Sequence, residues 1–470
     1  MIRATTVLTV LLGALGAAVQ TAPASAADLW VDGGRARCSD ALAATKVSTP
    51  DRTWCSLSRA ASQAAPGDTV HVLAATYRES VRFGNSGRPD APIRFVAAEP
   101  GVVVDANGAA ATLKLIDVSD VQVSGMRVTG GLTHGIWVEG GARIRLSDLD
   151  VASNPGAGIT AKGVAELTVE ASTLSGNGAA GIMEVAGTRN ARYVGNEIRG
   201  NGLASAIYNG DGIQLGGTGA RVAGNVITGN GSGTFEHGIY SSAASSGWTI
   251  EGNTIADNAG ANVKAAGGPG LVRRNRLTNG RFGLVLSDNP VPVTVEHNVI
   301  DGSAQHLVFL TTGSAAAQAR LWANTVVQFG RSTTSGEAST VFVNAATFLE
   351  LRDNLLSYAG ADNLGVALWV NDPARLGELV SDTNWFTARD AQSRHLAWAG
   401  HRMTLADWRV SSGQDSRSLS SWAPTFDADR RVTSTNWGLG RGQNLGLAED
   451  FAGAPLPATG AVDIGAFQAG

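Results

Sequence analysis

The residues best suited to chemistry lie in two columns of a short pattern that recurs along the chain. Its units read HGIWVE, AGITAK, AGIMEV, DGIQLG, HGIYSS, ANVKAA and FGLVLS, and each has an aliphatic residue in third position. The fourth positions include Gln214, Tyr240 and Lys264, and the first positions include Asp211 and His237. Tyrosine, histidine and carboxylate groups can transfer protons, and a lysine can neutralise a negative charge. The pattern therefore indicates a candidate acid–base site.

Strand geometry decides whether these side chains can meet. Side chains alternate along a strand, so an inward third position turns the fourth position outward. Stacking the units would place Gln214, Tyr240 and Lys264 side by side, roughly 5 Å apart per step. A structural interpretation competes with this one. Asp211 and His237 would then face an interior corner as a hydrogen-bonded pair, Tyr240 would reflect strand propensity, and Lys264 would serve solubility.

A second repeat predicts how the chain stacks these units. Segments such as YVGNEI, VAGNVI, IEGNTI and VEHNVI recur at intervals of 22 to 30 residues. Short β-branched runs punctuated by glycine and asparagine favour a parallel β-solenoid, because the LxxLxLxxN pattern of a leucine-rich horseshoe is missing. Seven successive units have asparagine at one position, namely Asn196, Asn225, Asn253, Asn275, Asn298, Asn324 and Asn354. We expect these amides to stack as a buried ladder, since each one both donates and accepts.

A further set of asparagines follows the same repeat four or five residues later. It comprises Asn177, Asn201, Asn230, Asn258 and Asn279. Asparagine tolerates left-handed backbone in exposed turns, so surface turns are the expectation for this set.

Several stretches resemble a known superfamily. PGDTVHVLAATYRESVRF and SGRPDAPIRFVAAEPGVVVDA resemble the opening coil of secreted bacterial right-handed parallel β-helix proteins of the pectin-lyase-like superfamily, and PTFDADR and TGAVDIGAFQ resemble its C-terminal coil. The resemblance implies an all-β, single-stranded right-handed parallel β-helix. A helix within 56–65 is expected to cap its N-terminal end. We expect the cap and first coils over 27–110, regular coils over 111–360, and irregular coils with a cap over 361–470. A Trp-rich excursion in this last region is expected to pack on the solenoid wall, with stacking on sugar rings as the alternative.

The same resemblance implies a function. It suggests a polysaccharide lyase that cleaves an acidic polysaccharide by β-elimination, with Lys264, Tyr240, His237 and Asp211 as catalytic residues. Lys264 would neutralise the uronate carboxylate or act as base, Tyr240 would act as acid or base, and Asp211 would orient the His237 ring for proton transfer. Gln214 and Trp137 would contact substrate. The fold also serves other proteins, so a non-catalytic carbohydrate-binding or surface-interaction protein, and then a glycoside hydrolase, remain alternatives.

Calcium is a possible cofactor, because many lyases of this fold use it. Asp105, Asp117 and Asp120 are the candidate ligands, although no D-x-D-x-D-G loop supports them. The predictions therefore include no defined metal site.

The N-terminal sequence predicts export. Residues 1–26 contain Arg3, the apolar run TTVLTVLLGALGAAV and a final Ala-Ser-Ala, which is typical of a cleavable secretory signal. The run is too short to span a bilayer, and no later stretch of 18 apolar residues occurs. In an exported protein, Cys38 and Cys55 are expected to form a disulfide.

Composition narrows the choice of partners. The chain has 36 basic and 40 acidic residues, which gives a formal net charge of -4, and no basic patch in the sequence indicates nucleic acid. The expected partner is a polysaccharide, bound by a secreted, extracellular monomer without a membrane span.

Overall fold

The computed structural model describes residues 26–203, 210–302, 306–330, 338–360, 365–390, 392–433 and 438–468. Apart from Ala26, the predicted signal segment lies outside the described residues. No helix within the described ranges is long and apolar enough to cross a membrane.

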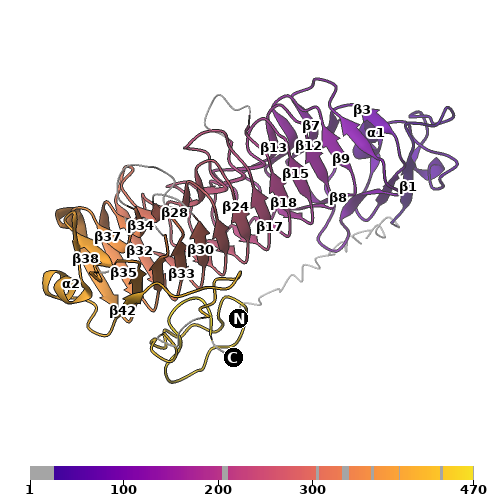
Figure 1. The fold of residues 1–470 in the computed structure, drawn as a ribbon. Coiled ribbons are helices and arrows are strands. Elements are labelled where there is room, and N and C mark those ends of the chain that lie inside the picture. The colour runs from indigo at the N-terminus through magenta and orange to yellow at the C-terminus, as the bar shows by residue number, and fades with distance from the viewer. Residues whose placement is uncertain are drawn as a thin grey trace, which may run out of the picture.

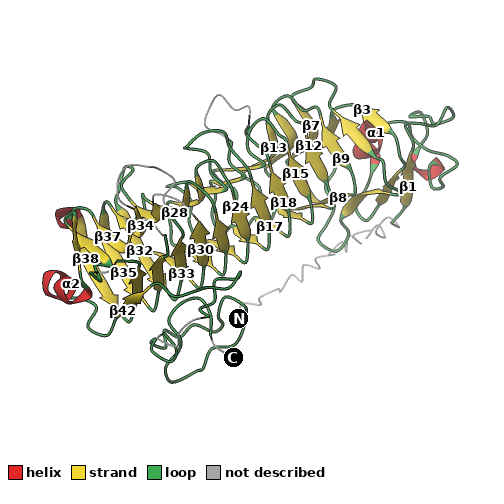
Figure 2. Cartoon of the chain, in the orientation of Figure 1, coloured by secondary structure: helices red, strands yellow, loops and turns green. Residues whose placement is uncertain are grey.

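The chain winds into an elongated parallel β-solenoid of short strands joined by loops, with very little helix (Figures 1 and 2). Three sheets of fourteen strands each form its walls. Sheet 1 runs from β1 (Asp28–Val31) to β38 (Leu376–Asp382), sheet 2 from β4 (Val81–Arg82) to β41 (His401–Met403), and sheet 3 from β3 (Thr76–Arg78) to β42 (Leu419–Trp422). The strands pair in parallel, except that β40 (Leu396–Trp398) and β41 are antiparallel. The expected fold class is therefore confirmed.

The aliphatic column of sheet 2 forms part of a continuous core. Its members are Ile136, Ile159, Ile182, Ile213, Ile239, Val263 and Leu284, paired one above another and fully buried. Burying an aliphatic side chain of this size contributes roughly 1.5–3 kcal/mol relative to leaving it exposed. This inward column fixes the register of sheet 2 and so turns the next residue of each unit outward.

The seven aligned asparagines form the expected ladder between sheets 1 and 3. The Nδ2 of each donates to the Oδ1 of the next at 2.9–3.0 Å. The ladder continues one step to Asn384, whose main-chain N–H donates to the Ser418 hydroxyl. At the other end, the Ser172 main-chain N–H donates to the Oδ1 of Asn196. The buried amides therefore satisfy one another.

The second asparagine set corrects the expectation of exposed turns. Asn177, Asn201, Asn230 and Asn258 are buried and form another ladder, with amide to amide distances of 2.9–3.0 Å. These residues lie where the chain passes from sheet 3 to sheet 2, and there the side chains turn inward and pair. Only Asn279 matches the prediction, since it is exposed and has a φ of 57°.

Helix α1 (Leu57–Gln63) occupies the N-terminal end. The Ser56 hydroxyl accepts a hydrogen bond from the main-chain N–H of Arg59 at 3.2 Å, which caps the helix start. Leu57, Ala60 and Ala61 are buried. The expected helix is present, and its role as a cap of the solenoid stays a prediction.

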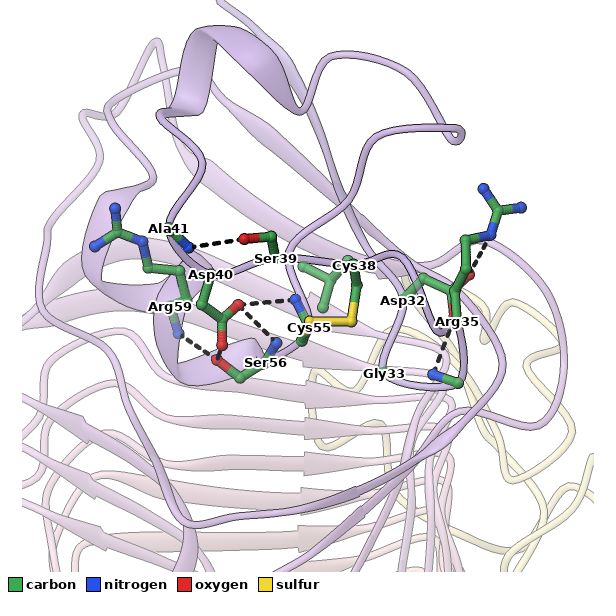
Figure 3. Close-up of a disulfide and its surroundings, with 12 residues drawn as sticks. Asp32, Gly33, Arg35, Cys38, Ser39, Asp40, Ala41, Cys55, Ser56 and Arg59 are labelled. Carbon is green, nitrogen blue, oxygen red and sulfur yellow. Dashed lines mark hydrogen bonds and ion pairs between the residues drawn. A yellow bond between two sulfur atoms is a disulfide. The ribbon is translucent and has the colours of Figure 1, made fainter.

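The disulfide between Cys38 and Cys55 is confirmed, with 5.0 Å between the Cα atoms (Figure 3). The Asp40 carboxylate beside it accepts hydrogen bonds from the main-chain N–H groups of Cys55 and Ser56. The bridge therefore ties the loop before α1 to the helix start.

Replacing both Cys38 and Cys55 with alanine should lower the free energy of unfolding by about 3 kcal/mol, because the unfolded chain gains the freedom of a loop with a sequence separation of 17. Urea unfolding of the oxidised parent and the double variant would measure this difference. Reductant should shift the midpoint of the parent and leave the variant unchanged. A parent that does not respond to reductant would contradict the prediction.

Regular strands continue beyond residue 360, where irregular coils were expected to begin. They include β39 (Trp385–Ala388), β40 and β42, and they stack on the strands before them. Trp385 and the α2 (Leu405–Ser412) residue Trp408 are buried, as expected for packing on the solenoid, whereas Trp422 is exposed. The chain after β42 turns back along the solenoid, and Arg430 pairs there with the buried Asp301.

Candidate active site

The outward column of sheet 2 brings three predicted residues together. It runs over β19 (Ile213–Leu215), β22 (Ile239–Ser241) and β25 (Ala261–Ala265). Gln214 pairs in register with Tyr240, and Tyr240 pairs with Lys264. The Lys264 Nζ lies 5.1 Å from the centroid of the Tyr240 ring, and all three side chains are partly exposed. An acid–base group and a cation therefore share one accessible surface.

Asp211 and His237 lie beneath this surface, and their contacts correct one predicted role. Both residues are buried. The Asp211 carboxylate accepts a hydrogen bond from the main-chain N–H of His237 at 2.6 Å, and the His237 Nδ1 accepts one from the main-chain N–H of Ala261 at 2.9 Å. The prediction that Asp211 orients the His237 ring is therefore wrong. At this corner the next coil presents a main-chain N–H, and each side chain satisfies that donor instead.

Burial controls the protonation of both residues. It raises the pKa of Asp211 to about 7, an effect that Glu236 strengthens and Lys264 weakens. Burial, together with the Lys264 charge, lowers the pKa of His237 to about 3. Because His237 Nδ1 accepts a hydrogen bond, the neutral ring has its proton on Nε2. At neutral pH the His237 ring is thus uncharged, and its Nδ1 lone pair is engaged by the main-chain N–H of Ala261.

Tyr240 has a raised pKa, first because it is partly buried and then because the carboxylates of Asp211 and Asp288 disfavour the phenolate. Asp288 was not among the predicted site residues. It follows β28 (Phe282–Leu286), and its carboxylate accepts hydrogen bonds from the Ser314 hydroxyl and the Ala315 main-chain N–H. Its position depends on the path of two loops, which the spacing of the repeat does not indicate.

Three aromatic residues extend the same outward column and were also missed. After Val285 it continues through Phe309 of β31 (His306–Leu310), Phe342 of β34 (Ala338–Val343) and Trp369 of β37 (Gly365–Val370). The ring centroids lie 5.6 Å apart between Phe309 and Phe342 and 5.9 Å apart between Phe342 and Trp369. The alternation in HLVFL, STVFV and VALWV was the signal that could have revealed them. Sheet 2 thus presents an aromatic stripe beyond Lys264.

Trp137 does not join the cluster. It lies on β10 (His134–Glu139), five strands from β25 in sheet 2, which corresponds to roughly 24 Å. Its Nε1 donates to the Glu139 carboxylate at 3.1 Å, and its ring packs edge-on against His134 with 4.1 Å between centroids. A contact between Trp137 and a sugar bound at Lys264 would require an extended ligand.

Two of the three candidate calcium ligands are engaged in protein contacts, and the third, Asp117, is exposed. Asp120 pairs with Arg143 at 2.7 Å, and Asp105 accepts a hydrogen bond from the main-chain N–H of Asn107 at 2.9 Å. Among the residues that the structure describes, no three or more His, Cys, Asp or Glu side chains are grouped to hold a metal ion. Dependence on calcium stays a prediction.

Comparison with known proteins confirms the class of fold. The family model of the right handed beta helix region matches residues 101–268 and 204–327. No curated protein sequence matches the chain. The chain therefore has the right-handed parallel β-helix fold that its sequence predicted.

Solved structures with the same fold have low sequence identity to this chain. The complex of XylC with xylose has a TM-score of 0.56 at 10% identity, covering 94% of this chain and 98% of that one. A mannuronic acid specific polysaccharide family 6 lyase from human gut microbiota has a TM-score of 0.51 at 13% identity, covering 77% and 87%. The GH136 lacto-N-biosidase from Eubacterium ramulus has a TM-score of 0.50 at 14% identity, covering 69% and 66%. At such identities the comparisons show the fold alone.

Proposed function

We propose that this protein is a polysaccharide lyase that cleaves an acidic polysaccharide by β-elimination on the outer face of sheet 2. The observation that carries the proposal is the placement of Lys264 Nζ 5.1 Å from the Tyr240 ring on one partly exposed surface. β-Elimination needs a cation for the uronate carboxylate and a group that moves a proton. Lys264 and Tyr240 have these two properties.

The proposed reaction needs no external oxidant or reductant. The Tyr240 phenolate removes the proton at C5 of the uronate, and the electrons of that C–H bond form a double bond between C4 and C5. The C4–O bond breaks, its electrons go to the leaving oxygen, and the Tyr240 phenol returns the proton to that oxygen. The Lys264 ammonium binds the carboxylate and so stabilises the negative charge that develops at C5. Gln214, one strand away from Tyr240, is positioned to contact a sugar hydroxyl.

The aromatic stripe supports a carbohydrate as ligand. Phe309, Phe342 and Trp369 present partly exposed rings at successive strands of the same sheet. Aromatic faces pack well against apolar faces, and pyranose rings offer such faces. The mannuronic acid specific lyase with the same fold is in keeping with an acidic polymer as substrate.

The same stripe favours one alternative, a carbohydrate-binding protein without catalytic activity. In that case the rings would hold the polymer while Lys264 only paired with its carboxylates. A simple assay distinguishes the two functions. A lyase generates an unsaturated product with new ultraviolet absorbance when offered polygalacturonate, alginate or glycosaminoglycans, with and without calcium, and a binder retains these polymers unchanged.

We also propose that the protein acts outside the cell. The disulfide between Cys38 and Cys55 is compatible with an oxidising compartment, where such bonds persist. An acidic polysaccharide would be encountered there as an extracellular polymer.

The pH dependence of the reaction tests the role of Tyr240. Because its pKa is raised above the ordinary value of 10.0, the phenolate fraction still increases with pH at pH 10. We expect kcat/KM to rise from pH 7 to pH 10 without a plateau, and Tyr240→Phe to lose activity at every pH. Initial rates of product absorbance would measure this, with circular dichroism to verify that the fold persists. A rate that falls with increasing pH would contradict Tyr240 as the base.

A further inference from the structure

A groove of about 550 Å³ lies on the outer face of sheet 1, a different wall from that of the candidate active site. It crosses β11 (Ala142–Ser147), β14 (Thr168–Glu170), β17 (Arg192–Val194), β20 (Arg221–Ala223) and β23 (Trp248–Glu251). Four arginines and one glutamate are the charged residues that line it, namely Arg143, Arg145, Arg192, Arg221 and Glu166. The sequence showed no basic patch, because the stacking of successive coils is what gathers these arginines.

Pairing does not remove the positive character of this surface. The side chains of Arg143, Arg145 and Arg221 are 43%, 55% and 42% exposed, whereas their carboxylate partners are only 6%, 24% and 7% exposed. The acidic partners therefore lie below the arginines, and the guanidinium groups face solvent. Arg192 is exposed and has no carboxylate partner among the described residues. Glu166 is the one exposed acidic residue in the lining, so an anion approaching the groove meets four arginines and one carboxylate.

The arginines follow a regular line. Register pairs Arg145 with Thr168, Thr168 with Arg192, Arg192 with Arg221, and Arg221 with Thr249. One strand step is about 4.8 Å, so Arg145 and Arg192 lie two steps apart with Thr168 between them, and Arg192 and Arg221 lie one step apart. This order fits an extended chain that has repeated anionic groups and many hydroxyls.

A neighbouring groove of about 510 Å³ shares Arg221 and adds Arg273 and Arg274, with Glu251 and Phe451 also in its lining. Its arginines are all paired, Arg221 and Arg273 with Glu251 and Arg274 with Glu449, so the first groove, with Arg192, has the stronger positive character. Phe451 is the single aromatic residue that lines the two grooves. Single-stranded nucleic acids are usually held by stacking of successive bases on aromatic side chains, so this surface is poorly suited to them.

We infer that the sheet 1 groove is a second binding site, for the carboxylates or sulfates of an acidic polysaccharide. The inference goes beyond the proposed lyase activity, because the groove contains none of the residues assigned to it. Guanidinium groups form strong, charge-assisted hydrogen bonds with such anions. A polymer anchored on sheet 1 would keep the protein close to its substrate while sheet 2 acts on another segment.

Binding without turnover tests this inference separately from the lyase proposal. In a Lys264→Ala, Tyr240→Ala background, which weakens binding on sheet 2, polygalacturonate and dextran sulfate would be titrated by calorimetry, with neutral dextran as the control ligand. We expect at least one of the two anionic polymers to bind and neutral dextran not to bind. Arg192→Glu should weaken that binding roughly tenfold, and added salt should weaken it further. Arg199→Glu on sheet 3 is the matched control, since Arg199 is also exposed, and should stay within about twofold of the background.

Three results would overturn the inference. They are absence of binding to both anionic polymers, equal affinities of the Arg192→Glu and Arg199→Glu variants, and tighter Arg192-dependent binding of a single-stranded oligonucleotide than of the polysaccharides. Absence of lyase activity in the parent protein, with this binding intact, would instead count against the lyase proposal alone.

Discussion

Replacing Lys264 with alanine is expected to lower kcat/KM on an acidic polysaccharide by roughly 10²- to 10⁴-fold. The Lys264 ammonium lies beside the Tyr240 ring, where it would neutralise the uronate carboxylate. Without it, negative charge at C5 develops with no opposing cation in this part of the outward column. Initial rates of product absorbance at low substrate concentration measure the effect. Lys264→Arg should recover part of the lost activity, because it keeps the charge with altered geometry.

Lys114 supplies the matched control. It occupies the same outward column on β7 (Ala111–Ile116), where it pairs in register with Trp137. It lies six strands from Lys264 in sheet 2, so Lys114→Ala should change kcat/KM by less than about twofold. Similar losses in the two variants would show that the general charge of sheet 2 matters rather than the position beside Tyr240. Full activity of the Lys264→Ala variant would contradict the proposed active site.

The largest effect on stability is expected from the ladder. The Oδ1 of Asn253 accepts from both the main-chain N–H and the Nδ2 of Asn225, and its own Nδ2 donates to the Val222 carbonyl and to Asn275. Asn253→Leu would leave several of these buried groups unpaired, at roughly 1–3 kcal/mol each. We therefore expect a loss of roughly 2–5 kcal/mol in the free energy of unfolding, measured as a lower urea midpoint.

Thr254 is the adjacent control, because it is exposed while Asn253 is buried. Thr254→Ala should change the free energy of unfolding by less than about 0.5 kcal/mol. An Asn253→Leu variant as stable as Thr254→Ala would mean that the ladder contributes little. Both variants should keep the lyase or binding activity of the folded protein, since neither position lies on the outer face of sheet 2.

Much of the fold was open to sequence reasoning because a solenoid repeats. The aligned asparagines predicted the ladder, and the aliphatic third positions predicted which residues of sheet 2 face inward. Both follow from a strand period of two and from the stacking of successive coils, so counting along the repeat was sufficient. The neighbourhood of Gln214, Tyr240 and Lys264 follows from the same count. The aromatic stripe was equally accessible, since HLVFL, STVFV and VALWV continue the alternation.

Turns were less predictable than strands. The sequence does not say whether a turn asparagine points inward, and Asn177 and Asn279, from the same set, differ in burial. The predicted contact between Asp211 and the His237 ring was wrong for a related reason. Its ring accepts a main-chain N–H from the next coil, and that donor becomes visible only when the coils are in place.

The sequence by itself determined the repeat, the inward column, the main ladder and the disulfide, because each depends on residue types at regular or short separations. Only the tertiary structure decided that Asp288 influences Tyr240 and that the carboxylate partners of the groove arginines are more deeply buried than the arginines. Those relations depend on the paths of irregular loops and on the depth of each carboxylate relative to its arginine. Neither the loop paths nor the carboxylate depths repeat at a regular interval in the sequence.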